Sequence, residues 1–585
     1  MLSTQAWRHS VCTYITLFRR AGHGWAAGAR GNIPYTPMLM AAPMERDVRS
    51  VCEEVVRLVV EGEVRTGEEL AMAKRRACER AGCARVPTDA EVLSLLPEEE
   101  RDAAMGLLRT KPSRTLSGVA VVAVMSPPSR CPHGRCAYCP GGVDAGTPQS
   151  YTGEEPAARR GRRAGYDGAV QVRARLAQLA AAGHATDKVE LVLMGGTFPA
   201  TERAFRDGFV RACLEALGDA PAADLRSAIA DNERAPHRCV ALTLETRPDT
   251  CATPEGVDDL LGLGATRVEL GVQTTVDRAL DLVGRGHRTR ESVEATRALK
   301  DAGLKVGHHL MPGLPGLSRE EDLAGLLRVV EDPDLRPDSL KLYPTLVMPG
   351  TPLHEWWLRG EYRPLDVEEA VETLAALKSR LPRWVRVSRV ERDIPAQLIA
   401  AGVRASNLRQ LVHARLEERG QRCQCIRCRE VGRRGTRRPA ASATAGAPDP
   451  RDLELREQRY AASGGEEGFL SLELPHEDAL VAYARVRRPS ARAWRPELEG
   501  AAVLREVRVL GEVLPLGARP SDARGSLQWQ HRALGARLLA QAEQAARSWG
   551  LRRLVVMAGM GARPYFRRLG YELDGPYMVR ALGQV

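Results

Sequence analysis

The sequence lacks any apolar run long enough to cross a bilayer. Its 585 residues are 44% hydrophobic and 27% charged, which is typical of a water-soluble protein of several domains. It also lacks the pattern of a disulfide framework, because its 13 cysteines are odd in number and six of them fall in two tight clusters. We therefore expect a cytoplasmic protein with no membrane partner, whose cysteines bind metal in a reducing compartment.

Acidic residues are absent from the first 44 positions, which contain Arg8, Arg19, Arg20 and Arg30. This composition is typical of an organelle transit peptide, and the alternative is a true start codon near Met44. We treat residues 1–44 as a disordered extension outside the fold. The whole chain carries a net charge of +11, which favours an anionic partner such as nucleic acid, although an arginine-rich genome gives the same balance.

A short loop contains Cys131, Cys136 and Cys139 with spacings of four and two residues. Three thiolates can hold three irons of a 4Fe–4S cluster and leave the fourth iron open. S-adenosylmethionine can chelate such an open iron, and one-electron reduction then cleaves it to a 5′-deoxyadenosyl radical. The alternative is a structural zinc site, in which His133 is the fourth ligand.

Short apolar runs alternate with amphipathic segments from residue 119 onward, after a helical region in which Val48, Val51, Val55 and Leu58 recur at helical spacing. The expected strands are Val119–Met125, Val189–Met194, Val240–Leu244, Arg267–Val272, Lys305–Leu310 and Ser339–Tyr343. Unalternated runs with helices between them predict an α/β fold with an incomplete parallel (β/α)6-type barrel. In such barrels the chemistry lies at the carboxyl ends of the strands.

Several of these strands end in glycine or polar residues. Gly195, Gly196 and Thr197 follow the second strand, and the later strands end at Glu245, at Gln273 and at the pair His308 and His309. Glycines let a backbone approach a ligand closely, although an ordinary tight turn uses them too. A single histidine is more often a structural residue than a functional one. Together, these strand ends predict the wall of a cofactor cavity.

The second cluster, Cys423, Cys425 and Cys428, has spacings that suit a tetrahedral thiolate site. We interpret it as structural zinc with His413 or a distant residue as the fourth ligand. An auxiliary iron–sulfur cluster and unliganded thiols remain open.

The last part of the chain follows an Ala/Ser/Thr/Pro-rich linker at residues 433–450 and resembles an acetyltransferase of the GNAT type. A helix is expected over Gln530–Trp549, and backbone N–H groups at its start can cradle the pyrophosphate of coenzyme A. The usual pattern has glycine where this chain has Ala533, which is tolerable if φ there is negative. The expected domains are a helical module at 45–115, the barrel at 116–400, a cysteine-containing zinc junction at 401–432 and a mixed α+β domain at 451–585.

Basic runs occur at Arg159–Arg163, at Lys111 and Arg114, and in the linker. Such charges contact phosphates without reading sequence, although a charge run is often only a solvated surface.

From about Lys111 to its end, the chain resembles the catalytic subunit of Elongator, a radical-SAM barrel fused to a GNAT-type domain. The matching segments are 111–118, the cysteine loop, 149–156, 187–190, 194–198, 245–249, 311–316, 392–395 and 570–578. The resemblance implies a radical-SAM enzyme that transfers a carboxymethyl group derived from acetyl-CoA to C5 of the wobble uridine (position 34) in tRNA. It implies binding of the anticodon stem-loop, with the helical module at 45–115 as a tRNA-binding element, and an external electron donor.

The resemblance also assigns roles to individual residues. The cluster ligands are Cys131, Cys136 and Cys139, and the expected catalytic residues are Lys188, Glu245 and Tyr565. The SAM cavity is assigned to Gly195, Gly196, Thr197, Glu245 and Gln273. The acetyl-CoA contacts are assigned to Lys188, Glu506, Val507, Arg508, Val509, Gln530, Leu534, Gly535, Ala536 and Phe566.

Two positions depart from the family pattern, since Ala533 replaces a glycine and Phe566 replaces a tyrosine. The four-residue gap between the first two cysteines looks bacterial or archaeal, which implies that the other Elongator subunits are not required; a homodimer is left open. Two further hypotheses are weighed: a protein lysine acetyltransferase that uses the GNAT-type domain, and a tRNA-binding protein with a degenerate coenzyme site.

Overall fold

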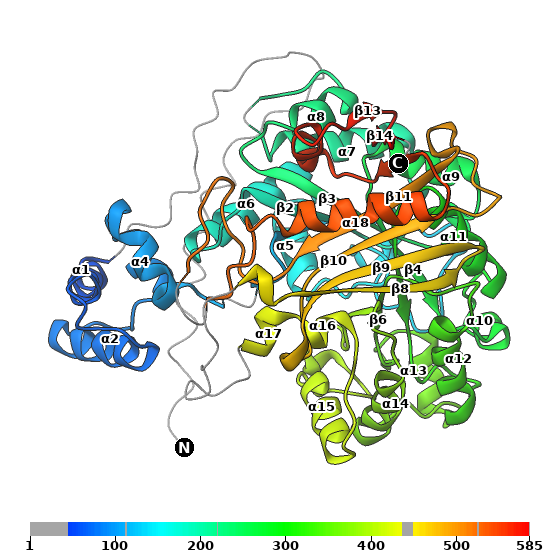
Figure 1. Cartoon of the computed structure of the whole chain (residues 1–585). Helices are drawn as coiled ribbons and strands as arrows, with labels where there is room; N and C mark the ends of the chain where they lie inside the picture. The colour runs from blue at the N-terminus through cyan, green and yellow to red at the C-terminus, as the bar shows by residue number, and fades with distance from the viewer. Residues whose placement is uncertain (1–44, 112–113, 219, 436–448, 523–525, 584–585) are drawn as a thin grey trace, which may run out of the picture.

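The computed structural model describes residues 45–111, 114–218, 220–435, 449–522 and 526–583 (Figure 1). The predicted extension at 1–44 and most of the predicted linker lie outside these residues. Within them, no helix is both long and apolar enough to span a membrane.

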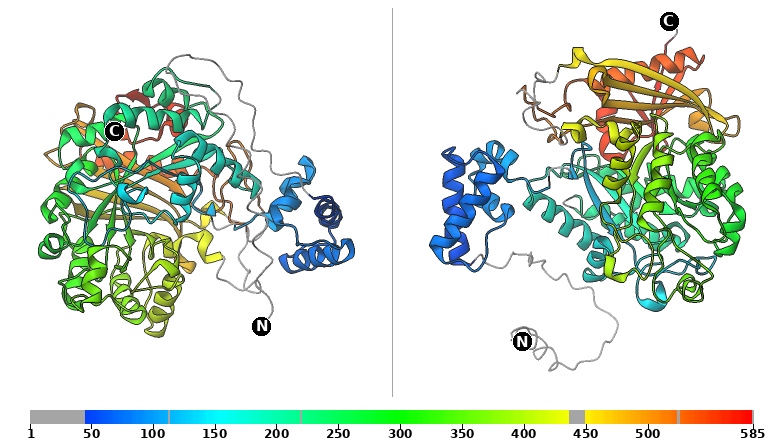
Figure 2. Two further views of the ribbon diagram at one scale, coloured as in Figure 1. Left: turned by 180° about the vertical axis from the view of Figure 1, so that it is seen from behind. Right: turned by 90° about the horizontal axis from the view of Figure 1, so that it is seen from below.

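Four helices form the N-terminal module: α1 (Arg46–Val60), α2 (Gly67–Ala81), α3 (Asp89–Ser94) and α4 (Glu98–Leu108). Thr66 and Thr88 accept hydrogen bonds from the third residue of α2 and of α3, which fixes where these helices begin. Val48, Val51 and Val55 are buried in a small core of the module's own, as their spacing predicts. The module lies to one side of the two sheet domains (Figure 2).

Seven parallel strands in sequential order form the half-barrel. They are β1 (Ala120–Met125), β2 (Lys188–Met194), β3 (Arg238–Thr246), β4 (Arg267–Gln273), β5 (Lys305–Leu310), β6 (Ser339–Leu342) and β7 (Arg386–Arg389). The six expected strands are all present. The seventh escaped prediction because Arg-Val-Ser-Arg contains no apolar run.

Helices connect these strands; most of them cover the outer face of the sheet, and the helix at Pro352–Leu358 packs against the cysteine loop. They are α5 (Pro156–Arg163), α6 (Gly168–Ala181), α7 (Arg203–Glu215), α8 (Leu225–Asp231), α9 (Pro254–Gly262), α10 (Asp277–Leu282), α11 (Thr289–Asp301), α12 (Arg319–Glu331), α13 (Pro352–Leu358) and α14 (Val367–Ser379). After β7 follow α15 (Leu408–Glu418), α16 (Ile426–Arg429) and α17 (Val431–Gly435).

The two faces of the barrel sheet differ in chemistry. In β2, Val189, Leu191 and Leu193 are fully buried in the core shared with the helices, while Lys188 and Glu190 point the other way, into the bore. All residues of β2 and β4 are buried or half-buried on both faces of the sheet, although apolar and charged side chains alternate along these strands. The bore contains charged side chains in place of the bulky apolar layers that usually fill such barrels.

A second, mixed sheet of seven strands forms the C-terminal domain, in the order β13-β14-β12-β11-β10-β9-β8. Its elements are β8 (Glu454–Ala462), β9 (Gly465–Leu474), β10 (Ala479–Arg488), β11 (Ala501–Val509), α18 (Leu534–Ser548), β12 (Arg553–Val556), α19 (Arg563–Arg567), β13 (Glu572–Asp574) and β14 (Tyr577–Ala581). This confirms the predicted α+β domain. The long helix begins at Leu534, four residues later than expected, because Ala533 has left-handed backbone angles.

The C-terminal domain covers the amino ends of the barrel strands. Arg505 of β11 forms ion pairs with Asp338, which precedes β6, and with Glu467 of β9. Arg487 of β10 pairs with Asp301 at the end of α11, 2.7 Å away. All of these side chains are buried, so each charge depends on its partners and the two domains form one unit.

Candidate active site

The cysteine loop lies directly after β1, at the carboxyl end of the barrel. Cys136 and Cys139 are buried and Cys131 is half-buried. Cys131 Sγ lies 3.2 Å from the hydroxyl of Thr197, and Gln149 donates from Nε2 to Cys139 Sγ over 3.0 Å. The predicted strand-end residue Thr197 is therefore part of the cysteine site.

The three loop sulfurs do not form a compact group around a single ion. Tetrahedral zinc with bonds of 2.3 Å places its sulfur ligands about 3.8 Å apart, and these three sulfurs do not all lie within 4.8 Å of one another. His133 Nε2 approaches Cys136 Sγ to 3.1 Å. The wider spacing suits a multi-iron cluster and disfavours the zinc alternative.

Buried polar atoms without partners gather around the same loop. Ser126 Oγ, His133 Nδ1 and Arg285 Nε have no hydrogen-bond partner within the described part of the chain. Such atoms are rare in folded proteins. Their concentration here fits a polar cofactor against the cysteine loop.

One neighbour of the cysteine loop was missed by the sequence analysis. Arg285 is buried, with Nη1 3.7 Å from Cys136 Sγ and Nη2 donating to Gly271 O over 2.7 Å. Gly286 has φ +72°, and a Cβ there would lie 2.6 Å from His133 Cβ. The signal in the sequence is Gly284-Arg285-Gly286-His287 after a predicted strand, and only the fold places it against the cysteines.

The glycines after β2 are required by close contact with the chain itself. A Cβ on Gly195, at φ +134°, would lie 2.1 Å from Ser126 Oγ, and one on Gly196 would lie 3.0 Å from Gln149 Cβ. Gln273 at the end of β4 has φ +71°, which is unusual for a residue with a side chain. Strained backbone of this kind is concentrated at functional sites, which agrees with the role predicted for Gln273.

Glu245 belongs to a buried cluster of charges in the bore. Lys341 Nζ lies 2.9 Å from Glu245 and also pairs with Glu269, while Tyr151 donates from its hydroxyl to Glu245 over 2.9 Å. Burial raises the pKa of Glu245, but Lys341 and His309 outweigh burial and hold the pKa below its ordinary value. Glu245 is therefore an ionised carboxylate at neutral pH.

The two adjacent histidines on β5 differ in environment. His309 faces the bore, with Nε2 2.8 Å from Glu269. His308 faces the helices, is fully buried, and lies 2.9 Å from the hydroxyl of Thr296. His308 is thus a structural residue, and His309 alone belongs to the cluster in the bore.

Lys188 lies at the opposite end of the barrel from Glu245, as the first residue of β2. Its Nζ donates to Gln530 Oε1 over 2.7 Å, and Gln530 Nε2 donates to Gly118 O over 3.1 Å. Burial lowers the pKa of Lys188. Two predicted coenzyme residues are thereby brought together, while Lys188 and Glu245 are held apart.

The predicted coenzyme loop before α18 has strained backbone. Ala533 has φ +58° and His531 has φ +62°. The condition that makes alanine tolerable at position 533, a negative φ, is therefore not met. A left-handed alanine costs about 1 kcal/mol or more relative to glycine.

The two aromatic residues of α19 are placed differently. The hydroxyl of Tyr565 would lie 3.1 Å from a Cβ on Gly535, so it stands beside the start of α18. Phe566 is buried, with its ring centre 5.9 Å from that of Tyr571. Tyr565 thus lies next to the coenzyme loop, whereas Phe566 is part of the core.

Four further predicted coenzyme contacts lie on β11: Glu506, Val507, Arg508 and Val509. Glu506 and Arg508 are engaged in the interface between the domains: Glu506 lies 3.4 Å from Arg267, and Arg508 lies 3.2 Å from Glu190. Their side chains are occupied by these ion pairs.

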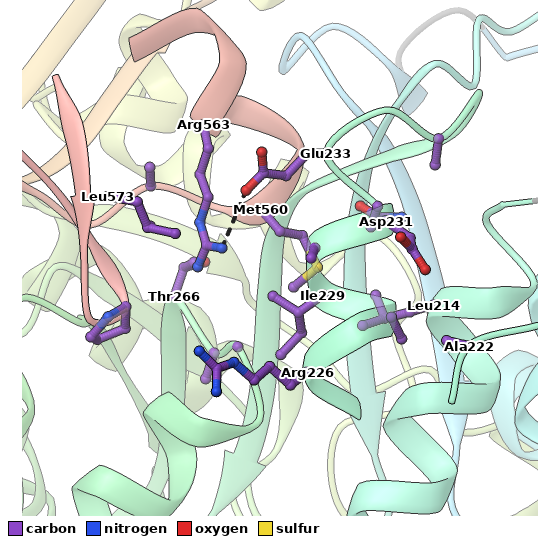
Figure 3. A pocket seen from close by; sticks show the side chains of 18 of the residues that line it. Leu214, Ala222, Arg226, Ile229, Asp231, Glu233, Thr266, Met560, Arg563 and Leu573 are labelled. Carbon is purple, nitrogen blue, oxygen red and sulfur yellow. Dashed lines mark hydrogen bonds and ion pairs between the residues drawn. The ribbon is translucent and has the colours of Figure 1, made fainter. Parts of the chain in front are cut away.

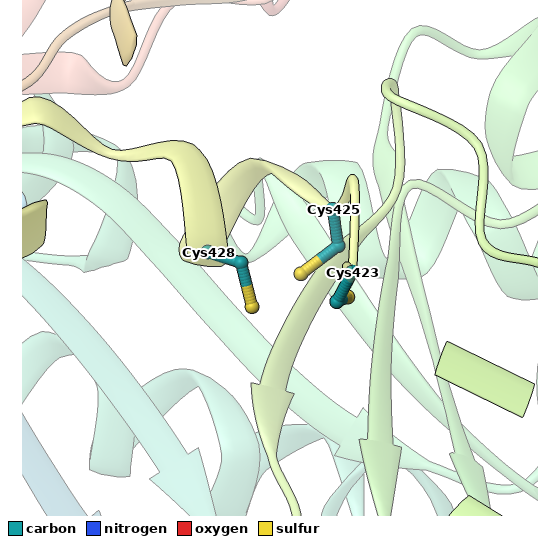
Figure 4. Close-up of side chains that lie close together, drawn as sticks. All are labelled: Cys423, Cys425 and Cys428. Carbon is teal, nitrogen blue, oxygen red and sulfur yellow. The ribbon is translucent and has the colours of Figure 1, made fainter. Parts of the chain in front are cut away.

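The second cysteine cluster is compact. The sulfurs of Cys423, Cys425 and Cys428 lie within 4.8 Å of one another (Figure 4). His413 Nε2 is 3.6 Å from Cys428 Sγ, close to the separation of about 3.5 Å that a nitrogen and a sulfur share on one zinc ion. The ammonium of Lys378, fully buried, lies 3.4 Å from Cys423 Sγ and would offset thiolate charge. The donor set fits zinc.

A cavity of about 1030 Å³ lies between the two sheet domains (Figure 3). Arg563 of α19 reaches Glu233 across it, at 3.4 Å. No residue predicted for the active site lines this cavity.

Comparison with known proteins agrees with this architecture. Residues 125–327 match the model of the Radical SAM superfamily, residues 337–418 that of the Radical_SAM C-terminal domain, and residues 48–116 that of the ELP3 N-terminal domain. A seven-stranded half-barrel with a three-cysteine loop after its first strand defines a radical SAM protein.

Relatives extend the likeness over both domains. The tRNA uridine(34) acetyltransferase of Methanocaldococcus jannaschii is 46% identical over 85% of this chain and 90% of its own length. Elongator complex protein 3 of Homo sapiens is 38% identical over 92% of this chain and 98% of its own. The structure of Methanocaldococcus infernus Elp3 with its N-terminus deleted matches with a TM-score of 0.69 and 41% identity, over 80% of this chain and 100% of that one. The chain belongs to the Elongator complex protein 3 family.

Proposed function

We propose that the protein is a radical SAM enzyme that transfers a carboxymethyl group derived from acetyl-CoA to C5 of uridine 34, the wobble position of tRNA. The observation that supports this proposal most directly is the placement of the two predicted cofactor sites. The cysteine loop and Gly195 lie at the carboxyl ends of β1 and β2, and Lys188 with the coenzyme loop lies at their amino ends. The same two strands thus connect the two predicted cofactor sites. The relative named tRNA uridine(34) acetyltransferase supports the choice of substrate.

Cys131, Cys136 and Cys139 would hold the cluster, and Thr197 and Gln149 stand against their sulfurs. When bound, the cluster would supply the electron that cleaves S-adenosylmethionine to start radical chemistry. Arg285 presents a guanidinium to this site, and Gln273 and the ionised Glu245 lie at strand ends that face it. The reducing electron would come from an external donor.

Basic side chains near the start of the barrel would bind tRNA. Burial and the nearby charge of Arg114 lower the pKa of Arg160, and burial together with Arg160 lowers the pKa of Arg175 to about 10. Among the described residues, neither Arg160 nor Arg175 forms an ion pair. Unbalanced positive charges of this kind would be stabilised by phosphate groups, and the helical module would extend the surface toward the anticodon stem-loop.

Cys423, Cys425, Cys428 and His413 would bind structural zinc and brace the junction between β7 and the C-terminal domain. We further propose a cytoplasmic enzyme that works without the other Elongator subunits. Replacing Cys428 with serine should remove about one equivalent of zinc while the iron content stays unchanged.

A protein lysine acetyltransferase is disfavoured by how the domains meet. A Cβ on Gly559 would lie 2.1 Å from Val240 O, and one on Gly561 would lie 2.5 Å from Arg238 Cβ. The start of β3 therefore covers the segment after β12, where an acceptor peptide would need an open groove. None of the matching relatives described above carries a protein acetyltransferase name.

The test is anaerobic reconstitution with iron, sulfide, S-adenosylmethionine, acetyl-CoA and tRNA, followed by mass spectrometry of the nucleosides. Carboxymethyluridine should form with the wild type and be absent with Cys131→Ala. Labelled acetyl groups transferred to protein by the Cys131→Ala variant, with no change in tRNA, would instead favour the acetyltransferase.

A further inference from the structure

The cysteine loop is backed by a small apolar core of its own, separate from the main core of the two sheet domains. This core includes Val283, just after α10, and Leu353 of α13. Ala137 N donates a hydrogen bond to Val283 O, and Leu353 N donates to Ala137 O, both over 2.9 Å. Since Ala137 lies between Cys136 and Cys139, α10 and α13 are attached directly to the stretch that bears two predicted cluster ligands.

The two most exposed large apolar side chains among the described residues lie on these same two helices. Leu358, the last residue of α13, is 65% exposed, and Leu282, the last residue of α10, is 49% exposed. Leu282 directly precedes Val283, and Leu358 lies about 8 Å along its helix from Leu353. Single exposed apolar side chains are common in soluble proteins. Two highly exposed ones beside one functional loop indicate a contact surface.

Arg135 places a positive charge on the cysteine loop itself. The side chain is exposed, and its hydrogen bonds go to backbone oxygens: Nε donates to Cys139 O and Nη2 to Gly350 O, each over 3.0 Å. No carboxylate in the described part of the chain forms an ion pair with it. A carboxylate on a partner would therefore be drawn to the loop, next to the cysteines.

We propose that Leu282, Leu358 and Arg135 form the docking surface for the external electron donor, and that this donor is a small protein with carboxylates around its redox centre, of the kind that ferredoxins and flavodoxins represent. This proposal rests on the proposed function and adds the class of the donor and the place where it binds. In each encounter the carrier loses one electron and a cluster on the three loop cysteines gains it, while no covalent bond forms or breaks. Electron transfer slows steeply with distance, so a surface attached directly to the cysteine loop suits this role. Contacts of this class are small and short-lived, which two leucines and one arginine can support.

The tRNA substrate does not account for this surface. Asp281 pairs with Arg288 at 3.0 Å. Arg359 pairs with Glu361 at 2.7 Å and is also attracted by Glu355. The surroundings of the two leucines thus have no excess of positive charge, and leucine side chains offer nothing to a phosphate. The basic side chains proposed for tRNA lie on α5 and α6, which pack against β1, whereas α10 follows β4 and α13 follows β6.

The test compares a carrier protein with dithionite, a small reductant that needs no docking surface. Leu358→Glu and Leu282→Glu place a charge in the proposed surface, and Leu573→Glu is the matched control, because this leucine of β13 is 45% exposed and belongs to the C-terminal domain. The probes are a flavodoxin and a bacterial ferredoxin. Surface plasmon resonance with the oxidised carrier measures binding without turnover, and stopped-flow absorbance measures reduction of the reconstituted protein by the reduced carrier.

At least one of the two carriers should bind and reduce the wild type. Each of the two surface variants should bind that carrier at least about tenfold more weakly and be reduced correspondingly more slowly, while Leu573→Glu matches the wild type. All variants reduced with dithionite should cleave S-adenosylmethionine at the wild-type rate and bind tRNA with wild-type affinity, which also shows that they are folded.

Wild-type affinity for the carrier in both surface variants would overturn the docking surface and leave the proposed function intact, and so would failure of both carriers to bind the wild type. Weaker tRNA binding by the surface variants, with carrier binding unchanged, would assign the surface to RNA instead. Failure of the dithionite-reduced wild type to cleave S-adenosylmethionine would contradict the proposed function, and the docking surface with it.

Discussion

Lys188 donates a hydrogen bond from Nζ to Gln530 Oε1 over 2.7 Å, and this contact joins a barrel strand to the loop that begins the long helix of the C-terminal domain. The same glutamine bonds to Gly118 O and accepts from Leu514 N. One buried side chain thus holds the predicted coenzyme loop against the starts of β1 and β2.

Replacing Gln530 with leucine should leave the ammonium of the half-buried Lys188 without this hydrogen-bond partner. We expect a loss of about 1–3 kcal/mol in stability, as for other buried unpaired polar groups, and at least about tenfold weaker coenzyme A binding. Gln544→Leu, on the exposed face of α18, is the control. Chemical denaturation measures the loss of stability, and calorimetry measures the affinity for coenzyme A. If Gln530→Leu bound coenzyme A as tightly as the wild type, this contact would have no role in coenzyme binding.

Replacing Ala533 with glycine should relieve the left-handed backbone at φ +58°. We expect a gain of about 1 kcal/mol in the free energy of unfolding, and tighter coenzyme A binding because the loop is less strained. Ala540→Gly, in the exposed middle of the same helix, should instead lose about 1 kcal/mol. If Ala533→Gly and Ala540→Gly changed the free energy of unfolding in the same direction, position 533 would have no special backbone strain.

Replacing Glu467 with glutamine should break the buried network between the domains. Glu467 is fully buried and pairs with Lys300, Arg487 and Arg505. Removing one partner leaves uncompensated buried charge, which costs about 3–5 kcal/mol. Glu457→Gln, on the exposed strand β8, should change stability by less than about 1 kcal/mol. A small effect at Glu467 would mean that the interface depends on apolar packing instead.

Asp322 at the start of α12 predicts a pH dependence of stability. Burial raises its pKa to about 6, although its carboxylate accepts a hydrogen bond from Gly313 N. The folded state therefore holds this proton more tightly than the unfolded state, and the stabilisation is lost as pH rises through 6. Asp322→Asn should gain roughly 1 kcal/mol relative to the wild type between pH 5 and pH 7.5.

The control for that prediction is Glu320→Gln on the same turn. Hydrogen bonds within its own turn lower the pKa of Glu320, so it stays ionised throughout this range. Its effect should be the same at both pH values. If the effect of Asp322→Asn on stability were also the same at both pH values, the pKa of Asp322 would not lie in this range.

The sequence predicted those parts of the fold whose signals are local. A strand such as β1 was found because an apolar run marks it, and the cysteine loop because its spacing is itself the chemical signature. Strands β7 and β8 were missed because neither contains an apolar run: β7 is Arg-Val-Ser-Arg, and β8 is rich in arginine and glutamate. No local pattern distinguishes His309 from His308, since only the alternation of β5 decides which one faces the bore.

The placement of the site depended even more on the fold. Arg285 is almost 150 residues from Cys136 in sequence, and only the half-barrel brings them together. Likewise, the sequence placed Lys188 and Glu245 in one catalytic group, whereas they lie toward opposite ends of the barrel. The left-handed angle of Ala533 had only an indirect signal, the glycine that the usual pattern places there, because alanine itself favours negative φ.

The most direct test of the account uses acetyl-CoA with three deuterium atoms on its methyl group, in the anaerobic reaction with S-adenosylmethionine and tRNA. If the methyl group of the donor is attacked and becomes the new carbon on uridine 34, one deuterium should appear in 5′-deoxyadenosine and two should remain in the carboxymethyl group. Mass spectrometry of both products measures this. Unlabelled 5′-deoxyadenosine together with an unmodified uridine 34 would contradict the account.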